Sequence, residues 1–450
     1  MAKTYFHQIR MTALVTIKSN PCQKSFQVSP YGKSHSRLRK KSATVRRTTR
    51  LNSRKQRQDI SRIVLSVLCC LLLSQPSSAQ TSSKQQGTAE QAHPLYEFTI
   101  LNKQKQEQTL QATQVVETRD GGVLMLTRDG RMLNVPPQQL KQRRQLDKIF
   151  TPLGESELEQ QLTEELGPGF TFTRTKHFIL CSQADKRYSQ WCGSLFERLY
   201  KVMRNYWDSN ELLLHEPQVP LIAIIFKDRA AFAAYASQHV KKDVTDLHGY
   251  YSSQSNRIVL YDLTAASNGQ PASADADILV KIRKSPSSIV SVLHECTHQI
   301  AFNIGLHTRY ADNPLWLTEG IATFFETPNL NSKADWQTVG RPNSLRIKQF
   351  VDYARSRRKA DSLQTLISSN QRFQNQETLL DAYAEAWAFS YFLIKTRRRD
   401  YEKYLKLIAD RKPLIKVTSE EQLKAFQTVF GNDLMLLDQQ FLNYIREIAN

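Results

Sequence analysis

Two histidines and a glutamate form the most chemically informative group in this 450-residue sequence. His294 and His298 are four residues apart, so both imidazoles project from one face of an α-helix, about one turn apart. That spacing lets two ring nitrogens reach one tetrahedral metal ion at about 2 Å each. Glu295 follows the first histidine, where its carboxylate can contact a water molecule without binding the ion itself. We therefore expect His294 and His298 to bind one Zn²⁺ ion per chain.

The segment that carries this group has the signals of a helix. It follows Pro286, opens with a serine that can act as N-cap, and ends at Gly305. The alternative, a pair of surface histidines on an amphipathic helix, is disfavoured because the flanking positions are apolar: Val290, Leu293, Ile300, Ala301 and Ile304. A helix over 287–305 that buries both histidines is the prediction.

A second apolar helix, expected within 313–326, carries Glu319 between Leu317 and Ile321. A carboxylate in such surroundings needs a cationic partner, so Glu319 is the expected third ligand. Glu326, two turns further along, is the competing candidate, since a site with two histidines needs only one carboxylate. Gly320 would let this helix approach the 287–305 helix closely.

The two segments together resemble the gluzincin zinc metallopeptidases, that is, the aminopeptidase-N-like and related families. Their signature is HExxH followed, after about twenty residues, by a W-L-x-E-G-x-A helix, which is similar to residues 316–322 here. The resemblance implies that Glu319 completes the zinc site. It also implies that Glu295 takes a proton from a zinc-activated water and returns it to the leaving amine.

A further stretch, 381–391, is similar to the gluzincin helix that supplies a catalytic tyrosine. By that resemblance Tyr383 would donate a hydrogen bond to the developing oxyanion. The alternative is a core tyrosine packed at helical spacing with Trp387 and Tyr391.

Residues 248–251 and 257–263 resemble the turn and edge strand beside the active-site cleft of these enzymes. An edge strand can hold an extended peptide by main-chain pairing, although a purely structural strand is an equal alternative. The Gly-x-Met-Glu-Asn motif of aminopeptidases is missing from the sequence, so the choice between endo- and exopeptidase action stays open.

The elements that surround these residues indicate an α+β fold. Short strands at 95–100, 114–118, 123–127 and 132–135, with turns at Asp120–Gly122 and Asp129–Gly130, predict a small SH3-like β domain over 94–153. Strands at 176–182, 219–226 and 257–263 and helices at 185–207, 230–238 and 433–448 follow. We interpret 154–450 as a zincin-like catalytic domain, with a small mixed sheet and a helical subdomain.

The net charge of +20 suggests a polyanionic partner, but its distribution argues otherwise. Of 62 Lys+Arg and 42 Asp+Glu, residues 1–80 hold 16 and one, which leaves 46 bases and 41 acids in the rest. The basic stretch precedes an apolar run at 63–73 and small residues up to Ala79, as in a secretory signal.

We therefore expect a leader and signal peptide over 1–79, cleaved near Ala79, and a linker over 80–93. The mature chain would be secreted, periplasmic or in the cell envelope, with no nucleic-acid partner. The apolar run is too short to favour a membrane span, although a signal anchor is possible.

Three cysteines follow the leader: Cys181, Cys192 and Cys296. Buried free thiols are favoured, and a disulfide between Cys181 and Cys192 is the alternative. His215 and His307 read as surface histidines. The sequence as a whole predicts an exported zinc peptidase that acts on a peptide or protein substrate. An inactive zincin-like binding protein of the cell envelope is the alternative, which the intact Glu295 disfavours.

Overall fold

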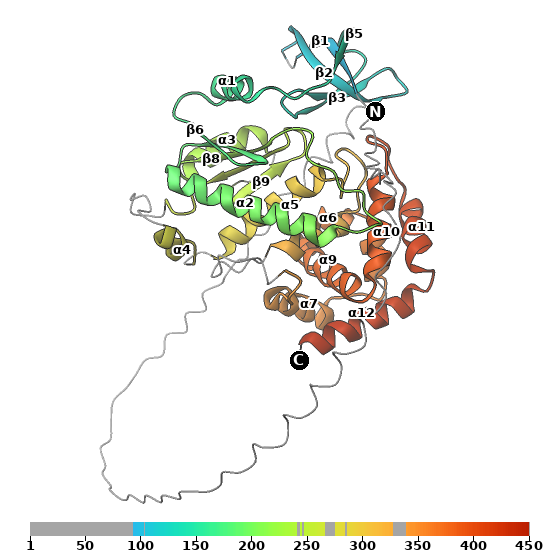
Figure 1. The fold of residues 1–450 in the computed structure, drawn as a ribbon. Helices are drawn as coiled ribbons and strands as arrows, with labels where there is room; N and C mark the ends of the chain where they lie inside the picture. The colour runs from blue at the N-terminus through green and yellow to red at the C-terminus, as the bar shows by residue number, and fades with distance from the viewer. Residues whose placement is uncertain are drawn as a thin grey trace, which may run out of the picture. The chain divides into compact units, whose positions relative to one another are not determined.

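A computed structural model describes residues 93–102, 104–240, 244, 247–265, 275–283, 286–326 and 339–449 (Figure 1). The predicted leader, signal peptide and all but the last residue of the predicted linker lie outside these ranges. Within them the chain is mixed α+β, with two five-stranded sheets and twelve α-helices. No helix in the described ranges is both long and apolar enough to cross a membrane.

The first sheet, called here the N-terminal sheet, is antiparallel and has the strand order β4-β3-β2-β1-β5. Its strands are β1 (Pro94–Leu101), β2 (Glu107–Glu117), β3 (Val123–Thr127), β4 (Met132–Val135) and β5 (Leu140–Ile149). The predicted turns follow from glycine, because Gly121 and Gly130 have φ values of +86° and +88°. Four of these strands match the predicted ones in place.

Strand β5 was not predicted, and the reason is its composition. Most of its residues are charged or amide-bearing and are exposed, so the strand shows no alternation of apolar and polar positions. It exists because its main chain pairs with β1 along the edge of the sheet. Its charges protect that edge from pairing with another chain.

The second sheet has the order β6-β7-β8-β10-β9 and mixes parallel and antiparallel pairs. Its strands are β6 (Thr171–Arg174), β7 (Phe178–Ser182), β8 (Leu221–Phe226), β9 (Gly249–Ser252) and β10 (Arg257–Tyr261). The middle strands β7 and β8 are buried on both faces, as their continuous apolar sequences predict.

Helices cover both faces of this second sheet (Figure 1). Helices α2 (Lys186–Trp207) and α5 (Pro286–Asn303) share one apolar cluster with alternate strand residues such as Leu180 and Ile225. Helices α1 (Glu155–Leu166) and α3 (Arg229–His239) share another with the intervening residues, such as Ile179 and Ile224. Helix α4 (Asp275–Arg283) was not predicted.

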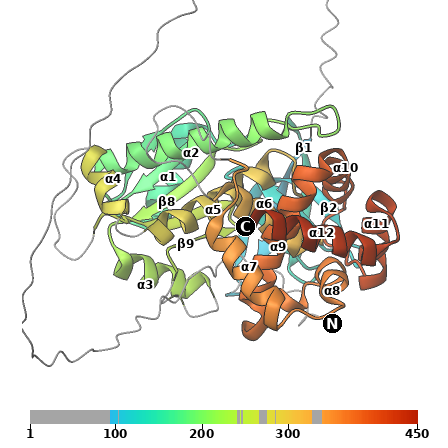
Figure 2. The same ribbon diagram turned by 90° about the horizontal axis from the view of Figure 1, so that it is seen from below.

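The rest of the described chain is helical. Its elements are α6 (Leu315–Phe325), α7 (Ser344–Ser356), α8 (Ser362–Ser368), the 3₁₀ turn η2 (Gln371–Phe373), α9 (Gln376–Thr396), α10 (Arg398–Ala409), α11 (Ser419–Phe430) and α12 (Leu434–Ala449). Helix α6 packs against α9, and α7 and α12 lie beside α9 as well (Figure 2).

The role predicted for Gly320 is wrong in one respect. It permits a close approach of α6 to α9, not to the helix with the two histidines. A Cβ atom on Gly320 would lie 1.9 Å from Oγ of Ser390 and 3.0 Å from the carbonyl oxygen of Ala386. The glycine is therefore required by the α6–α9 contact.

Cys181, Cys192 and Cys296 are buried free thiols, so the alternative of a Cys181–Cys192 disulfide is wrong. Burial raises the pKa of each thiol. These cysteines serve as small apolar residues in the layers around the second sheet.

Candidate metal centre

Two neighbouring helices bring the three predicted ligands together. Helix α5 carries His294 and His298, and α6 carries Glu319. Nε2 of His294 lies 3.0 Å from Oε2 of Glu319 and 3.2 Å from Nε2 of His298, and the latter nitrogen lies 3.4 Å from Oε2 of Glu319. All three side chains are buried. The group could hold a metal ion.

The spacing of these atoms fits one tetrahedral ion. Ligand atoms about 2.0–2.1 Å from a shared tetrahedral centre lie about 3.3 Å apart, close to all three distances found here. The donor set of two imidazole nitrogens and one carboxylate oxygen is also one that Zn²⁺ favours.

The charges around the group favour a cation at the same place. Glu319 is 2% exposed, and among the described residues only His294 and His298 form ion pairs with it. Burial alone would raise the pKa of Glu319, but the two imidazoles outweigh burial and lower it. In the metal-free chain the imidazoles supply the positive charge that this buried carboxylate needs, and a bound divalent ion would take over that role.

Glu326, the competing candidate for third ligand, occupies a different place. Its Oε2 lies 3.2 Å from Nδ1 of His294, the ring nitrogen that faces away from Glu319 and His298. Arg346 holds the same carboxylate through Nε at 2.9 Å and Nη2 at 3.2 Å. Glu326 therefore fixes the orientation and tautomer of the His294 ring, in the way that carboxylates support metal-binding histidines. This contact with Arg346 has no signature in the sequence.

Glu295 is held by the main chain of the second sheet. Its Oε2 accepts a hydrogen bond of 2.8 Å from the backbone N–H of Tyr251 on β9. Burial raises the pKa of Glu295 to about 8, although His294 and the Tyr251 N–H oppose the shift. Oxygen Oε2 is thus engaged, which leaves Oε1 for other partners. Sequence reasoning did not find the Tyr251 donor.

Tyr383 lies on α9 beside the group. Its ring centre is 6.3 Å from that of His294 and 5.6 Å from that of Phe373. Burial raises the pKa of Tyr383 well above its usual value, and the nearby Glu319 and Glu295 carboxylates add to the shift. The phenol therefore stays protonated and can donate a hydrogen bond.

The edge of the second sheet is not the strand that was predicted. Strand β10 lies between β8 and β9, so its main-chain groups are paired on both sides. The edge strand is β9, the strand that supplies the Tyr251 donor to Glu295. The segment expected as a turn, 248–251, is therefore mostly the edge strand β9, and the segment expected as the edge strand, 257–263, contains the inner strand β10.

The two histidines that were predicted to lie at the surface differ in their exposure to solvent. His215 is exposed, as predicted. His307 is 2% exposed, so its prediction is wrong: Gly305, with φ of +91°, turns the chain back after α5 and places His307 beside Phe302. Burial lowers the pKa of His307 to about 3, which keeps the imidazole neutral.

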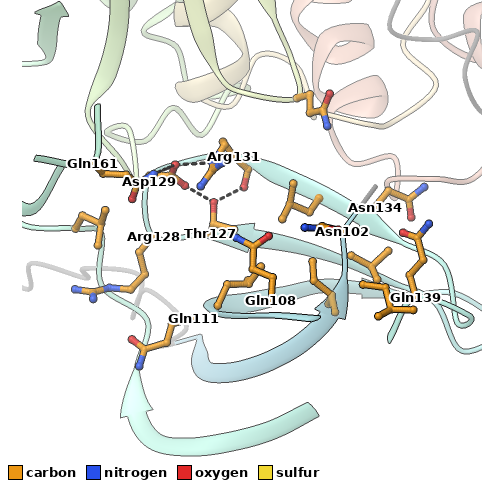
Figure 3. Close-up of a pocket in the computed structure, with 17 residues that line it drawn as sticks. Asn102, Gln108, Gln111, Thr127, Arg128, Asp129, Arg131, Asn134, Gln139 and Gln161 are labelled. Atoms are coloured by element: carbon orange, nitrogen blue, oxygen red, sulfur yellow. Dashed lines mark hydrogen bonds and ion pairs between the residues drawn. The ribbon is translucent and has the colours of Figure 1, made fainter. Parts of the chain in front are cut away.

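A separate cleft of about 410 Å³ lies beside the N-terminal sheet (Figure 3). Its polar lining is rich in side-chain amides, among them Asn102, Gln108, Asn134 and Gln161. None of the predicted zinc ligands or catalytic residues lines it. The cleft and the metal centre are distinct features of the chain.

Comparison with protein families gives one match. Residues 288–415 match a family described as "Protein of unknown function (DUF1570)". That segment contains the three candidate ligands, Glu295 and Tyr383, but covers less than half of the chain. No curated protein matches the chain.

Proposed function

We propose that the chain is an exported zinc-dependent peptidase of the gluzincin type, with a zincin-like catalytic domain behind an SH3-like β domain. The observation that carries the proposal is the buried triangle of His294, His298 and Glu319, with Glu295 adjoining it. The proposal of export rests on the signal-like sequence before Ala79.

Zinc held by these three residues would polarise a substrate carbonyl and lower the pKa of a water molecule to about 7. Glu295 receives the proton of that water on Oε1, because Oε2 is occupied by the Tyr251 N–H. A base with a raised pKa can return the proton to the leaving amine near neutral pH.

Tyr383 has the second role. Its protonated hydroxyl, close to His294, is suited to donate to the oxyanion that develops on the substrate carbonyl. Strand β9 is the proposed peptide-binding strand, since it lies at the edge of the sheet and beside Glu295. A peptide or protein is therefore the proposed substrate.

The test uses the chain from residue 80 onward and compares it with Glu295→Gln and Glu319→Gln. Bound metal is measured by mass spectrometry, and cleavage is followed with a mixed peptide library. We expect one zinc per chain and cleavage for the unsubstituted protein, zinc without cleavage for Glu295→Gln, and loss of zinc for Glu319→Gln.

Two outcomes would contradict the proposal. A folded protein that takes up no zinc after supplementation would remove the metal site altogether. Full zinc occupancy without cleavage of any peptide would instead support a zincin-like binding protein.

A further inference from the structure

The turn between β9 and β10, residues 253–256, joins the edge strand to the rest of the second sheet. Because Tyr251 on β9 donates its N–H to Glu295, the place of that carboxylate depends on the place of β9. A strand of four residues at the edge of a sheet has one neighbouring strand to hold it. The contacts of its turn therefore contribute to the orientation of Glu295.

One set of contacts comes from helix α5. Asn256 has φ of +59°, a conformation that asparagine tolerates better than most residues. Its side-chain amide exchanges hydrogen bonds of 2.8 and 2.7 Å with Asn303, and its carbonyl oxygen accepts a bond of 2.7 Å from Gln299. These contacts hold the end of the turn against the helix that carries the histidines.

A second set comes from the N-terminal sheet. The N–H of Met132, at the start of β4, donates to the carbonyl oxygen of Gln254 at 2.7 Å. Arg309 donates from Nη1 to the carbonyl oxygens of Gly130 at 3.0 Å and Ser253 at 3.2 Å. Its guanidinium, in a residue only 6% exposed, thus joins the β3–β4 turn to the β9–β10 turn.

The β3–β4 turn is itself held firmly (Figure 3). Asp129 pairs with Arg131 at 2.6 Å, accepts a bond from the hydroxyl of Thr127, and accepts another from Gln161 of α1 at 2.7 Å. A Cβ atom on Gly130 would lie 2.9 Å from Cγ2 of Val219, so the turn also lies directly against the segment that leads into β8.

We propose that the β3–β4 hairpin of the N-terminal sheet is a positioning element for Glu295, acting through Arg309, the β9–β10 turn and the Tyr251 N–H. The inference rests on the proposed function, in which Glu295 is the general base. It assigns the N-terminal sheet a part in the reaction, in place of an independent module with no role in catalysis. The sheet contributes by holding β9, not by contacting the substrate.

The principal test is Arg309→Met, which removes both hydrogen bonds. Hydrogen exchange of peptides covering 248–252 reports on the Tyr251 amide without any need for activity. We expect that amide to exchange about two- to tenfold faster, as loss of one hydrogen bond implies. For peptide cleavage we expect kcat to fall by about 10- to 100-fold, with KM and zinc content unchanged, since no zinc ligand is displaced.

Two further variants allow for a loss of folding in Arg309→Met. Arg309→Lys keeps one donor and is expected to recover part of the protection of β9. Gly130→Ala disturbs the same contact from the hairpin side, through its φ of +88° and the crowding with Val219. Arg143→Ala, which removes an exposed ion pair with Glu117 in the same sheet, is the matched control and should change nothing.

Glu295→Ala is the positive control for the exchange measurement. It removes the acceptor of the Tyr251 N–H, so the Tyr251 amide should exchange faster even with Arg309 intact. Unaltered exchange of β9 in folded Arg309→Met and Gly130→Ala would overturn the inference, because the contacts with α5 would then suffice. If the unsubstituted protein cleaves no peptide, the proposed function fails, whereas the exchange data still decide whether the hairpin holds β9.

Discussion

Replacement of Glu326 by glutamine tests whether the His294 ring is held for metal binding. The carboxylate of Glu326 is 1% exposed, accepts from Nδ1 of His294 at 3.2 Å, and pairs with Arg346 through two nitrogens. A glutamine of the same shape keeps a weaker acceptor for the imidazole but removes the negative charge. The change therefore tests whether the charge of Glu326, and not only its shape, orients the His294 ring.

Two magnitudes follow from these contacts. Loss of a carboxylate behind a metal-binding histidine lowers metal affinity by about 10- to 100-fold. Arg346 is also left as a buried, unpaired cation, which costs about 3–5 kcal/mol in the free energy of unfolding. The double change Glu326→Gln with Arg346→Met removes that unpaired cation, so it should regain much of the stability but none of the zinc affinity.

The assay is competition for zinc against a chelator of known affinity, with urea unfolding of the metal-free protein in parallel. Glu97→Gln is the matched control, because its ion pair with Arg144 is exposed and worth about 1 kcal/mol or less. Zinc affinity equal to that of the unsubstituted protein, in folded Glu326→Gln, would refute the reasoning. A double variant no more stable than Glu326→Gln would refute the part that concerns Arg346.

Three further predictions concern packing, acid stability and thiol chemistry. Gly320→Ala should lower the free energy of unfolding by about 1–3 kcal/mol in urea titrations, because the added methyl group meets Ser390, and Ser390→Gly should relieve part of the loss. Burial raises the pKa of Asp129, but Arg131, the Thr127 hydroxyl and Arg257 outweigh it and hold that pKa below its usual value. The ionised Asp129 therefore stabilises the fold at pH values above its unfolded pKa of about 3.9, and this stabilisation is lost as the pH falls through the lower folded pKa. In urea titrations at several acidic pH values, the free energy of unfolding of Asp129→Asn should fall less steeply with decreasing pH than that of the unsubstituted protein. The thiols of Cys181, Cys192 and Cys296 should resist a thiol reagent in the native protein and react on unfolding, and rapid native labelling would contradict their burial.

Periodic apolar patterns made much of the fold predictable. The helix with His294 and His298 and the buried strand at 221–226 were located because one face, or both, must be apolar. Strand β5 escaped prediction because its sequence is polar. Helix α4 escaped because its nine residues are too few to show a clear helical period. Their existence depends on pairing or packing with segments that are distant in sequence, which no local pattern reports.

Some residues of the candidate site could likewise be predicted from the sequence and others could not. The i, i+4 spacing of two histidines and the isolated carboxylate of Glu319 are local features, so the three possible ligands could be named from the sequence. The Tyr251 N–H has no sequence signature, since every residue except proline carries one. Arg346 is one of many arginines, and only the folded chain places its guanidinium against Glu326.

The candidate ligands and the helices that carry them can be read from local sequence, because helical geometry links sequence spacing to a common face. The folded chain was needed to show that Glu319, and not Glu326, faces the two Nε2 atoms, and that β9 holds Glu295. It also showed that Gly320 serves the contact with α9. The physical reason is that these facts are distances between segments remote in the chain, which are set by how whole helices and sheets pack.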